Sequence, residues 1–223
     1  MSNFYRLIQG DCMKVLPTLK TYSTKLILTD PPYGVGLEYD NYNDDYLQNW
    51  YNLFSKFIIE AKRIASMTIL PSCRMASLKW IYNNYPPDWL ICWYKGSTGH
   101  RAFIGFNDWE PLLVYGKNKK VQMHDYFFCQ PERRDLGHPC PKPVKWAKWL
   151  IERTTEPNDI ILDPFLGSGT TMEACQELNR NCIGIEISPK YCEIVRKRCF
   201  GRQFLDREVS YSFDILTFRE VED

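Results

Sequence analysis

Residues 163–171 read Asp-Pro-Phe-Leu-Gly-Ser-Gly-Thr-Thr, the most informative stretch of the chain. It follows the apolar run Ile160–Leu162 and precedes residues with helical spacing, so we predict a strand, a glycine turn and a helix. Gly167 and Gly169 carry no Cβ atom, which lets such a turn pass close to a ligand. A P-loop would need a lysine after Gly169, and a dinucleotide fingerprint would need a third glycine. Neither is present.

An acidic residue farther along the chain gives the glycine turn a specific meaning. Glu186 ends the run Ile183-Gly184-Ile185-Glu186, about twenty residues after the turn. A carboxylate at the end of the next strand can accept hydrogen bonds from ribose hydroxyls. The turn and Glu186 together predict a cofactor that contains a nucleoside. A bare tight turn between strand and helix is the alternative.

Apolar runs alternate with segments of helical spacing along the rest of the chain. Strands are predicted at 4–9, 25–29, 67–70, 90–94, 111–115, 160–162 and 182–187. Helices are predicted at 12–19, 44–66, 72–85, 145–153, 171–178 and 189–199. This alternation is typical of an α/β fold with a mainly parallel sheet, in which ligands bind at the carboxyl ends of the strands.

A second turn, Asp30-Pro31-Pro32-Tyr33, ends the predicted strand 25–29. The two prolines make it a rigid arm, because each ring fixes φ. Its chemistry suits an exocyclic amino group of a nucleobase, whose nitrogen lone pair is delocalised into the ring. If Asp30 and the carbonyl of Pro31 accept the amino hydrogens, the lone pair is localised and free to attack a methyl group in line. Tyr33 could stack on the base. The alternative is a proline-rich turn capped by a buried tyrosine.

These two turns resemble motifs of the DNA amino-methyltransferases. Asp30-Pro31-Pro32-Tyr33 is similar to the D-P-P-Y motif of that family, and residues 163–171 are similar to its cofactor motif. The catalytic motif comes first, which is typical of the circularly permuted β class. The resemblance implies a Rossmann-like S-adenosylmethionine-dependent methyltransferase fold in one domain, 1–223. In it a seven-stranded, mainly parallel sheet is flanked by helices. The chain is expected to enter at the third strand, near 5–9, and to supply the first two strands last.

The resemblance also implies a reaction and a set of site residues. The methyl group of S-adenosyl-L-methionine would pass to N6 of an adenine that is flipped out of DNA. The catalytic residues would be Asp30, Pro31, Pro32 and Tyr33. Two further segments, Gly10-Asp11-Cys12 and His138-Pro139-Cys140-Pro141-Lys142-Pro143, resemble cofactor segments of the family. The implied cofactor-binding residues are Asp11, His138, Lys142, Asp163, Pro164, Phe165, Gly167, Ser168, Gly169, Thr170, Thr171 and Glu186.

The identity of the target base rests on one residue. In the family, an aspartate first in the motif usually accompanies adenine and a serine usually accompanies cytosine, so Asp30 favours adenine. Activity on N4 of cytosine or on RNA remains an alternative, as does a catalytically silent S-adenosylmethionine-binding module. The intact Asp30–Tyr33 motif argues against the silent module, because cofactor binding alone does not need it. An α/β enzyme acting on a small metabolite is the remaining alternative.

DNA binding would need local positive charge, because the net charge of the chain is only +1. Residues 117–153 carry nine Lys and Arg residues against four Asp and Glu residues. We predict that target recognition lies within about 86–137 and that double-stranded DNA is contacted by Lys119, Lys120, Arg133 and Arg134. The alternative is an ordinary solvated loop. No role is predicted for the tail at 201–223.

The composition argues against several other classes of protein. The nine cysteines include no C-x-x-C pair, so no metal site is predicted, and free thiols in a reducing compartment are expected. Neither a signal peptide nor a membrane-spanning run is present, so we expect a cytoplasmic protein encoded by a bacterium, an archaeon or a phage. The family resemblance adds a homodimer and a cognate restriction endonuclease as candidate partners.

Overall fold

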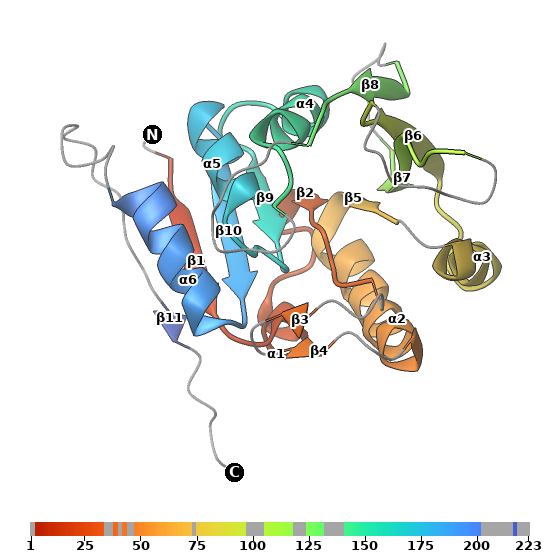
Figure 1. Cartoon of the computed structure of the whole chain (residues 1–223). Helices are drawn as coiled ribbons and strands as arrows, with labels where there is room; N and C mark the ends of the chain where they lie inside the picture. Colours follow the sequence, from red (N-terminus) through yellow and green to blue (C-terminus); the bar gives the residue numbers. More distant parts are fainter. Residues whose placement is uncertain are drawn as a thin grey trace.

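The computed structural model describes residues 3–33, 38–39, 42–43, 47–72, 75–96, 105–117, 124–131, 141–201 and 216–217. Within these residues the main sheet has nine strands and carries helices on both faces (Figure 1). Its strands are β1 (Tyr5–Gln9), β2 (Thr24–Leu28), β5 (Ala65–Pro71), β6 (Trp89–Tyr94), β7 (Trp109–Gly116), β8 (Tyr126–Phe128), β9 (Ile160–Asp163), β10 (Asn181–Glu186) and β11 (Leu216–Thr217). A separate two-stranded sheet pairs β3 (Glu38–Tyr39) with β4 (Tyr42–Asn43).

The strand order is β11-β1-β10-β9-β2-β5-β7-β6-β8. The run from β1 to β5 is parallel throughout, and β7 is antiparallel to both β5 and β6. As expected, β9 and β10 come late in the sequence yet lie between β1 and β2. The α/β fold with a mainly parallel sheet is thereby confirmed.

The expected seven strands are extended by two short edge strands. β8 adds three residues beside β6, and β11 adds two residues beside β1. Backbone hydrogen bonds from Cys92 N to Asp125 O and from Cys129 N to Tyr94 O hold β8 in place. A strand of this length is too short to show alternation, and the charged stretch 117–143 conceals it. The described part of 86–137 thus belongs largely to the main sheet.

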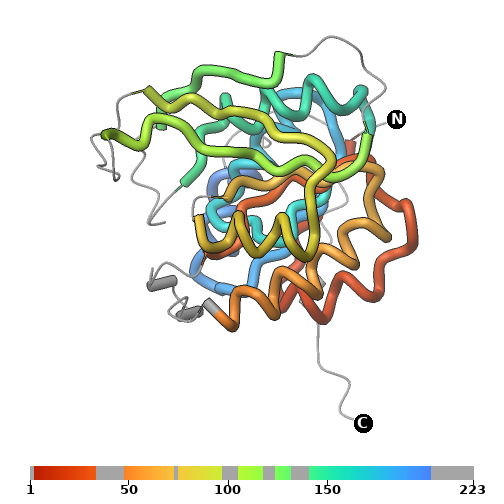
Figure 2. Tube along the Cα trace, turned by 90° about the vertical axis from the view of Figure 1, so that its right-hand side faces the viewer, coloured from red at the N-terminus to blue at the C-terminus, as the bar shows by residue number. Residues whose placement is uncertain are grey.

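The helices form two layers. One layer holds α1 (Cys12–Val15), α2 (Leu47–Ile64) and α3 (Met75–Asn84). The other holds α4 (Val144–Thr154), α5 (Thr170–Glu177) and α6 (Pro189–Val195), which continues as a π-helical turn, Arg196–Phe200. In the turned view the orange α2 and the teal α4 lie on opposite sides of the strands (Figure 2).

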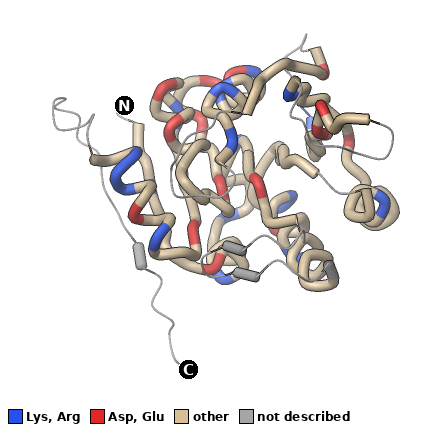
Figure 3. Tube along the Cα trace, viewed as in Figure 1, with Lys and Arg blue, Asp and Glu red and all other residues tan. Residues whose placement is uncertain are grey.

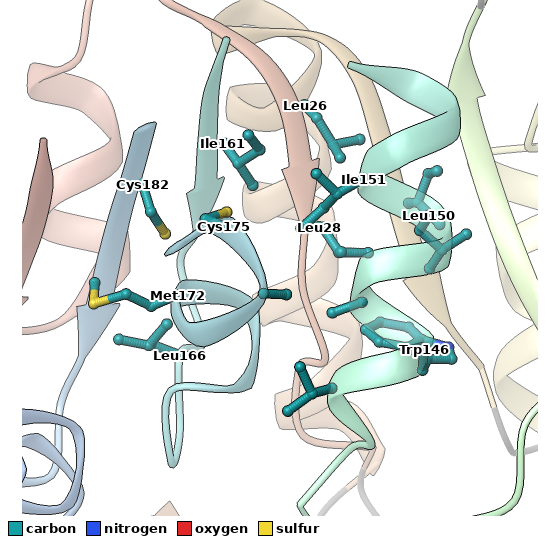
Figure 4. Packing of buried hydrophobic residues seen from close by; sticks show 14 of the residues in the cluster. Leu26, Leu28, Trp146, Leu150, Ile151, Ile161, Leu166, Met172, Cys175 and Cys182 are labelled. Carbon is teal, nitrogen blue, oxygen red and sulfur yellow. The ribbon is translucent and has the colours of Figure 1, made fainter. Parts of the chain in front are cut away.

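Burial of one apolar face holds each long helix on the sheet. On α2, Trp50, Phe54, Phe57, Ile58 and Ala61 recur at helical spacing and are at most 2% exposed. On the other face, Figure 4 shows residues of α4 reaching the β2 strand, with Leu150 and Ile151 beside Leu26 and Leu28. β2 is therefore covered on both sides, which explains its continuous apolar run.

A glycine at the end of β7 provides a test of this sheet. Gly116 has φ +95°, and a Cβ atom there would lie 2.3 Å from the carbonyl oxygen of Ser66. Gly116→Ala should therefore lower the free energy of unfolding by about 1–3 kcal/mol, measured by urea denaturation. A Cβ atom at Gly105 would meet no described atom within 4 Å, so Gly105→Ala is the matched control. Equal stability of the two variants would contradict this account.

Candidate active site

A cavity of about 300 Å³ lies at the carboxyl edge of the parallel strands. It brings both turns together, because its lining includes Asp30 and Pro32 as well as most of residues 163–171. The lining residues are Gly10, Asp11, Cys12, Met13, Asp30, Pro32, Leu53, Pro141, Lys142, Trp146, Asp163, Pro164, Phe165, Leu166, Gly167, Ser168, Thr170, Thr171, Ile185, Glu186, Ile187, Ser188 and Tyr191.

The sheet sets the order of the acidic groups along this cavity. Asp11, Glu186, Asp163 and Asp30 end or follow β1, β10, β9 and β2, which are neighbours in that order. Adjacent strands lie about 4.8 Å apart, so the four carboxyl groups extend over roughly 14 Å. The cavity therefore runs from Asp11 at one end to Asp30 at the other.

Two buried carboxyl groups shape the glycine turn. Glu186 accepts hydrogen bonds from Gly167 N at 2.7 Å and from Ser188 N at 2.8 Å, one on each oxygen. Asp163 Oδ1 accepts from the Thr29 hydroxyl at 2.6 Å and from Phe165 N at 3.1 Å. Each carboxylate oxygen can accept a second hydrogen bond, so Glu186 retains acceptor capacity on the cavity side.

Burial changes the acidity of both groups. It raises the pKa of Glu186 to about 7 and the pKa of Asp163 to about 6, although hydrogen bonds from backbone amides and hydroxyls oppose the rise. These values include charge repulsion, which acts from Asp163 on Glu186 and from Asp30 on Asp163. The edge of the cavity is thus a site where negative charge is held at a cost.

The two glycines of the turn serve different purposes. Gly167 has φ +54° and lines the cavity, as the sequence predicted for a close approach to a ligand. Gly169 has φ +89°, and a Cβ atom there would lie 3.2 Å from Val195 and 3.3 Å from Cys199. The absence of a Cβ at Gly169 therefore allows packing against α6 and the π-helical turn.

Arg198 fastens the glycine turn from the far side. Its guanidinium donates to the carbonyl oxygen of Ser168 at 2.8 Å and to the Thr170 hydroxyl at 3.4 Å, and it pairs with Glu173. The side chain is only 10% exposed. The π-helical turn 196–200 carries it, and π-type turns often occur at functional sites. Sequence reasoning missed this residue, because no local pattern links position 198 to position 168.

The second turn forms a cluster of charged and aromatic groups. The Tyr33 hydroxyl donates to Asp30 Oδ1, and Lys142 Nζ lies 3.0 Å from Asp30 Oδ2. Tyr33 is 8% exposed, and the Lys142 ammonium lies 5.5 Å from its ring centroid. The same ammonium lies 5.7 Å from the ring centroid of Trp93. Pro31 is buried and does not line the cavity.

Several predicted residues lie outside the described part of the chain: His138, Lys119, Lys120, Arg133 and Arg134. Their roles stay predictions. Some residues that line the cavity were not predicted from the sequence, namely Met13, Leu53, Trp146, Ile187 and Ser188. Ile187 and Ser188 adjoin Glu186 and could have been found by proximity, whereas Leu53 on α2 has no local signal.

The described residues show three further properties. Their seven cysteines are free, and no group of three or more His, Cys, Asp or Glu side chains among them could hold a metal ion. No helix in the described ranges is long and apolar enough to cross a membrane. Lys and Arg are mixed with Asp and Glu on α4 and α6 in Figure 3.

Comparison with known proteins identifies the family. The chain is 30% identical over 202 residues to the putative methylase YubD of Escherichia coli (strain K12), covering 83% of this chain and 86% of YubD. Residues 107–197 match a family described as DNA methylase. This chain belongs to the DNA methylase family. The methylase is also 28% identical over 234 residues to the type II methyltransferase M.HpaI of Haemophilus parainfluenzae, covering 86% and 73% of the two chains.

Solved structures share the fold of this methylase. The PvuII DNA methyltransferase (cytosine-N4-specific) matches with a TM-score of 0.70 and 17% identity, covering 94% of this chain and 89% of that one. The M1.HpyAVI–SAM complex matches with a TM-score of 0.64 and 23% identity, covering 88% of this chain and 100% of that one. The expected methyltransferase fold is confirmed.

The raised pKa of Asp163 predicts a pH-dependent stability. The folded state holds this proton more tightly than the unfolded state, so the contribution of Asp163 to stability is fully present below about pH 4. It is lost as the pH rises through about 6. Asp163→Asn keeps the acceptor for Thr29 and cannot ionise, so its stability relative to the wild type should rise by roughly 3 kcal/mol across that range and then level off.

Urea unfolding at pH 4 to 8 measures this difference. Asp159→Asn is the control, because the partly exposed Asp159 side chain caps Glu156 N at the opposite edge of the sheet. A difference between Asp163→Asn and the wild type that does not change with pH would show that Asp163 is not protonated preferentially in the folded state.

Proposed function

We propose that this methylase transfers the methyl group of S-adenosyl-L-methionine to N6 of an adenine in double-stranded DNA. The observation that carries the proposal is that Asp30 and Pro32 line the same cavity as most of residues 163–171. Each turn alone has an ordinary structural explanation, whereas together they provide a nucleoside site and a carboxylate for an amino group in the same space.

The residues of the cavity fit the proposed cofactor. Glu186 retains acceptor capacity for ribose hydroxyls, and Asp11 follows the neighbouring strand, so the nucleoside would bind at this end. Gly167 allows close contact with the turn. From there the cavity extends over roughly 14 Å to Asp30, which suits an elongated molecule. When bound, S-adenosylmethionine supplies a methyl group on a positively charged sulfur.

Asp30 would orient the target amino group. Its carboxylate lies at the end of the cavity farthest from Asp11, and its side chain is 24% exposed, so an entering base can reach it. By accepting an amino hydrogen, Asp30 would turn the nitrogen lone pair toward the methyl donor, and positioning would supply most of the rate enhancement. Because N6 lies inside the duplex, the base must be flipped into the site.

The choice of adenine rests on an aspartate as the first residue of the motif. N4 of cytosine is the second candidate, because the solved structure with the same fold and a TM-score of 0.70 is described as cytosine-N4-specific. Asp30 would play the same role for N6 of adenine and for N4 of cytosine, so only the methylated product distinguishes the two reactions. The homodimer, the restriction endonuclease and the DNA contacts of Arg133 and Arg134 remain predictions.

The experiment is methyl transfer from radiolabelled S-adenosylmethionine to unmethylated duplex DNA, with the product nucleosides separated. We expect label in N6-methyladenine. The rate for Asp30→Asn should fall at least about 100-fold, because an amide carries no negative charge and has only one oxygen that can accept a hydrogen bond. Asp159→Asn, at the opposite edge of the sheet, is the matched control. Label in N4-methylcytosine would show that the target base is cytosine rather than adenine. A methyl-transfer rate of the Asp30→Asn variant within a few-fold of the wild-type rate would overturn the role of Asp30.

A second variant tests the cofactor end of the cavity. Arg198→Met removes the hydrogen bonds that fasten Ser168 and Thr170, so the affinity for S-adenosylmethionine should fall about 10-fold, the equivalent of one charged hydrogen bond. Isothermal titration calorimetry measures it. Lys197→Met is the control, because the Lys197 side chain is 77% exposed and pairs only with Glu193 among the described residues. Unchanged affinity in Arg198→Met would refute the fastening role.

A further inference from the structure

Lys142 joins the two ends of the site. Its carbonyl oxygen accepts a hydrogen bond from the Thr170 hydroxyl at 3.0 Å, which ties its backbone to the glycine turn. Pro141 and Pro143 flank it, and Pro143 is the N-cap of α4 with φ −65° and ψ 141°. The prolines restrict the backbone on both sides. The starting point of the Lys142 side chain is therefore fixed by the cofactor end of the cavity.

The ammonium of Lys142 points the other way, to the catalytic motif. The side chain is 9% exposed, and Nζ lies 3.0 Å from Asp30 Oδ2. The ring centroids of Tyr33 and Trp93 lie 5.5 Å and 5.7 Å from the same ammonium. A nearly buried ammonium needs an anionic partner, because desolvation without one is costly. Asp30 is that partner, and the Tyr33 hydroxyl engages its other oxygen.

Two donors on two oxygens fix the plane of the Asp30 carboxylate. Without them an aspartate rotates about both of its side-chain torsions. Each oxygen can still accept a further hydrogen bond, and the plane decides where the accepting lone pairs point. A displacement of about 1 Å at a reacting group can lower the rate about 100-fold. Orientation of Asp30 is thus a requirement of the reaction rather than a detail of folding.

We propose that Lys142 is a positioning residue that orients Asp30 toward the target amino group and couples this orientation to the glycine turn. The inference rests on the proposed methyl transfer, in which Asp30 accepts an amino hydrogen. It adds to the expectation that Lys142 binds the cofactor, because its ammonium forms an ion pair with the carboxylate of Asp30. It also gives Trp93, which the sequence did not single out, a role as a wall beside the ammonium.

The test compares Lys142→Met with Lys142→Arg in the full-length protein. Lys142→Met removes the charge and keeps most of the side-chain volume, so kcat should fall about 100-fold while the Kd for S-adenosylmethionine changes less than about 3-fold. Lys142→Arg restores a cation and should recover kcat to within about 10-fold of wild type. Lys148→Met is the matched control, because Lys148 lies on the helix that follows Lys142 and forms an exposed ion pair with Glu177 at 2.7 Å.

The outcomes separate the possible roles of Lys142. If Lys142 acts only by binding the cofactor directly, Lys142→Met would raise the Kd for S-adenosylmethionine by at least the factor by which it lowers kcat. That result would overturn the proposal. If the ion pair is purely structural, Lys142→Met would lower the thermal midpoint of unfolding while the folded fraction keeps its kcat. That result would also overturn the proposal. Should Lys142→Met fail to fold, Lys142→Gln takes its place with the same expected split between kcat and Kd.

Failure of the inference is distinguishable from failure of the proposed function. The wild-type protein tests the function, because it must place label in a DNA nucleoside. If the wild type transfers methyl groups and Lys142→Met retains its kcat, the function stands and the positioning role is refuted. If the wild type transfers none, the function is refuted and the positioning role is refuted with it.

Discussion

The parallel register of β1, β10, β9 and β2 is the constraint on which the site depends. Gln9 lies opposite Glu186, Gly184 lies opposite Asp163, and Ile27 lies opposite Leu162, so the carboxyl ends of the four strands lie at one edge of the sheet. Side chains that are far apart in sequence then meet at one edge. Because the strands are hydrogen-bonded to one another, none of the acidic groups at this edge can shift without disturbing its neighbours.

The same arrangement concentrates buried negative charge, and hydrogen-bond donors in and around the glycine turn stabilise it. Backbone amides of Gly167, Ser188 and Phe165 point at carboxylates, and the hydroxyl of Thr29 adds a further donor. Arg198 then holds the carbonyl side of the turn. The turn is therefore shaped from both sides, by anions on one and a cation on the other, before any ligand binds. Such preorganisation is what binding sites need, because little ordering remains to be done when the ligand arrives.

The sequence predicted what is encoded locally. The turn at residues 163–171 and the carboxyl group of Glu186 belong to one strand–turn–helix–strand unit, so the fold class and most of the cavity could be inferred from them. The packing of Gly169 against α6 and the π-helical turn was not predicted, because the sequence could not place that helix against the glycine turn. The pairing of Lys142 with Asp30 and the reach of Arg198 to Ser168 were missed for the same reason. Contacts across many residues leave no periodic pattern.

The position of β9 and β10 in the sheet has a consequence for how the chain reaches its native state. During synthesis β1 and β2 emerge early, yet they are not neighbours, and the strands that fill the space between them end only at Asp163 and Glu186. The apolar edge of β2 must wait unpaired until then. Domains dominated by such non-local pairing fold slowly, and their folding intermediates expose unpaired strand edges that can aggregate. A chain whose synthesis ends before residue 186 would lack a complete β10 and would therefore be prone to aggregation.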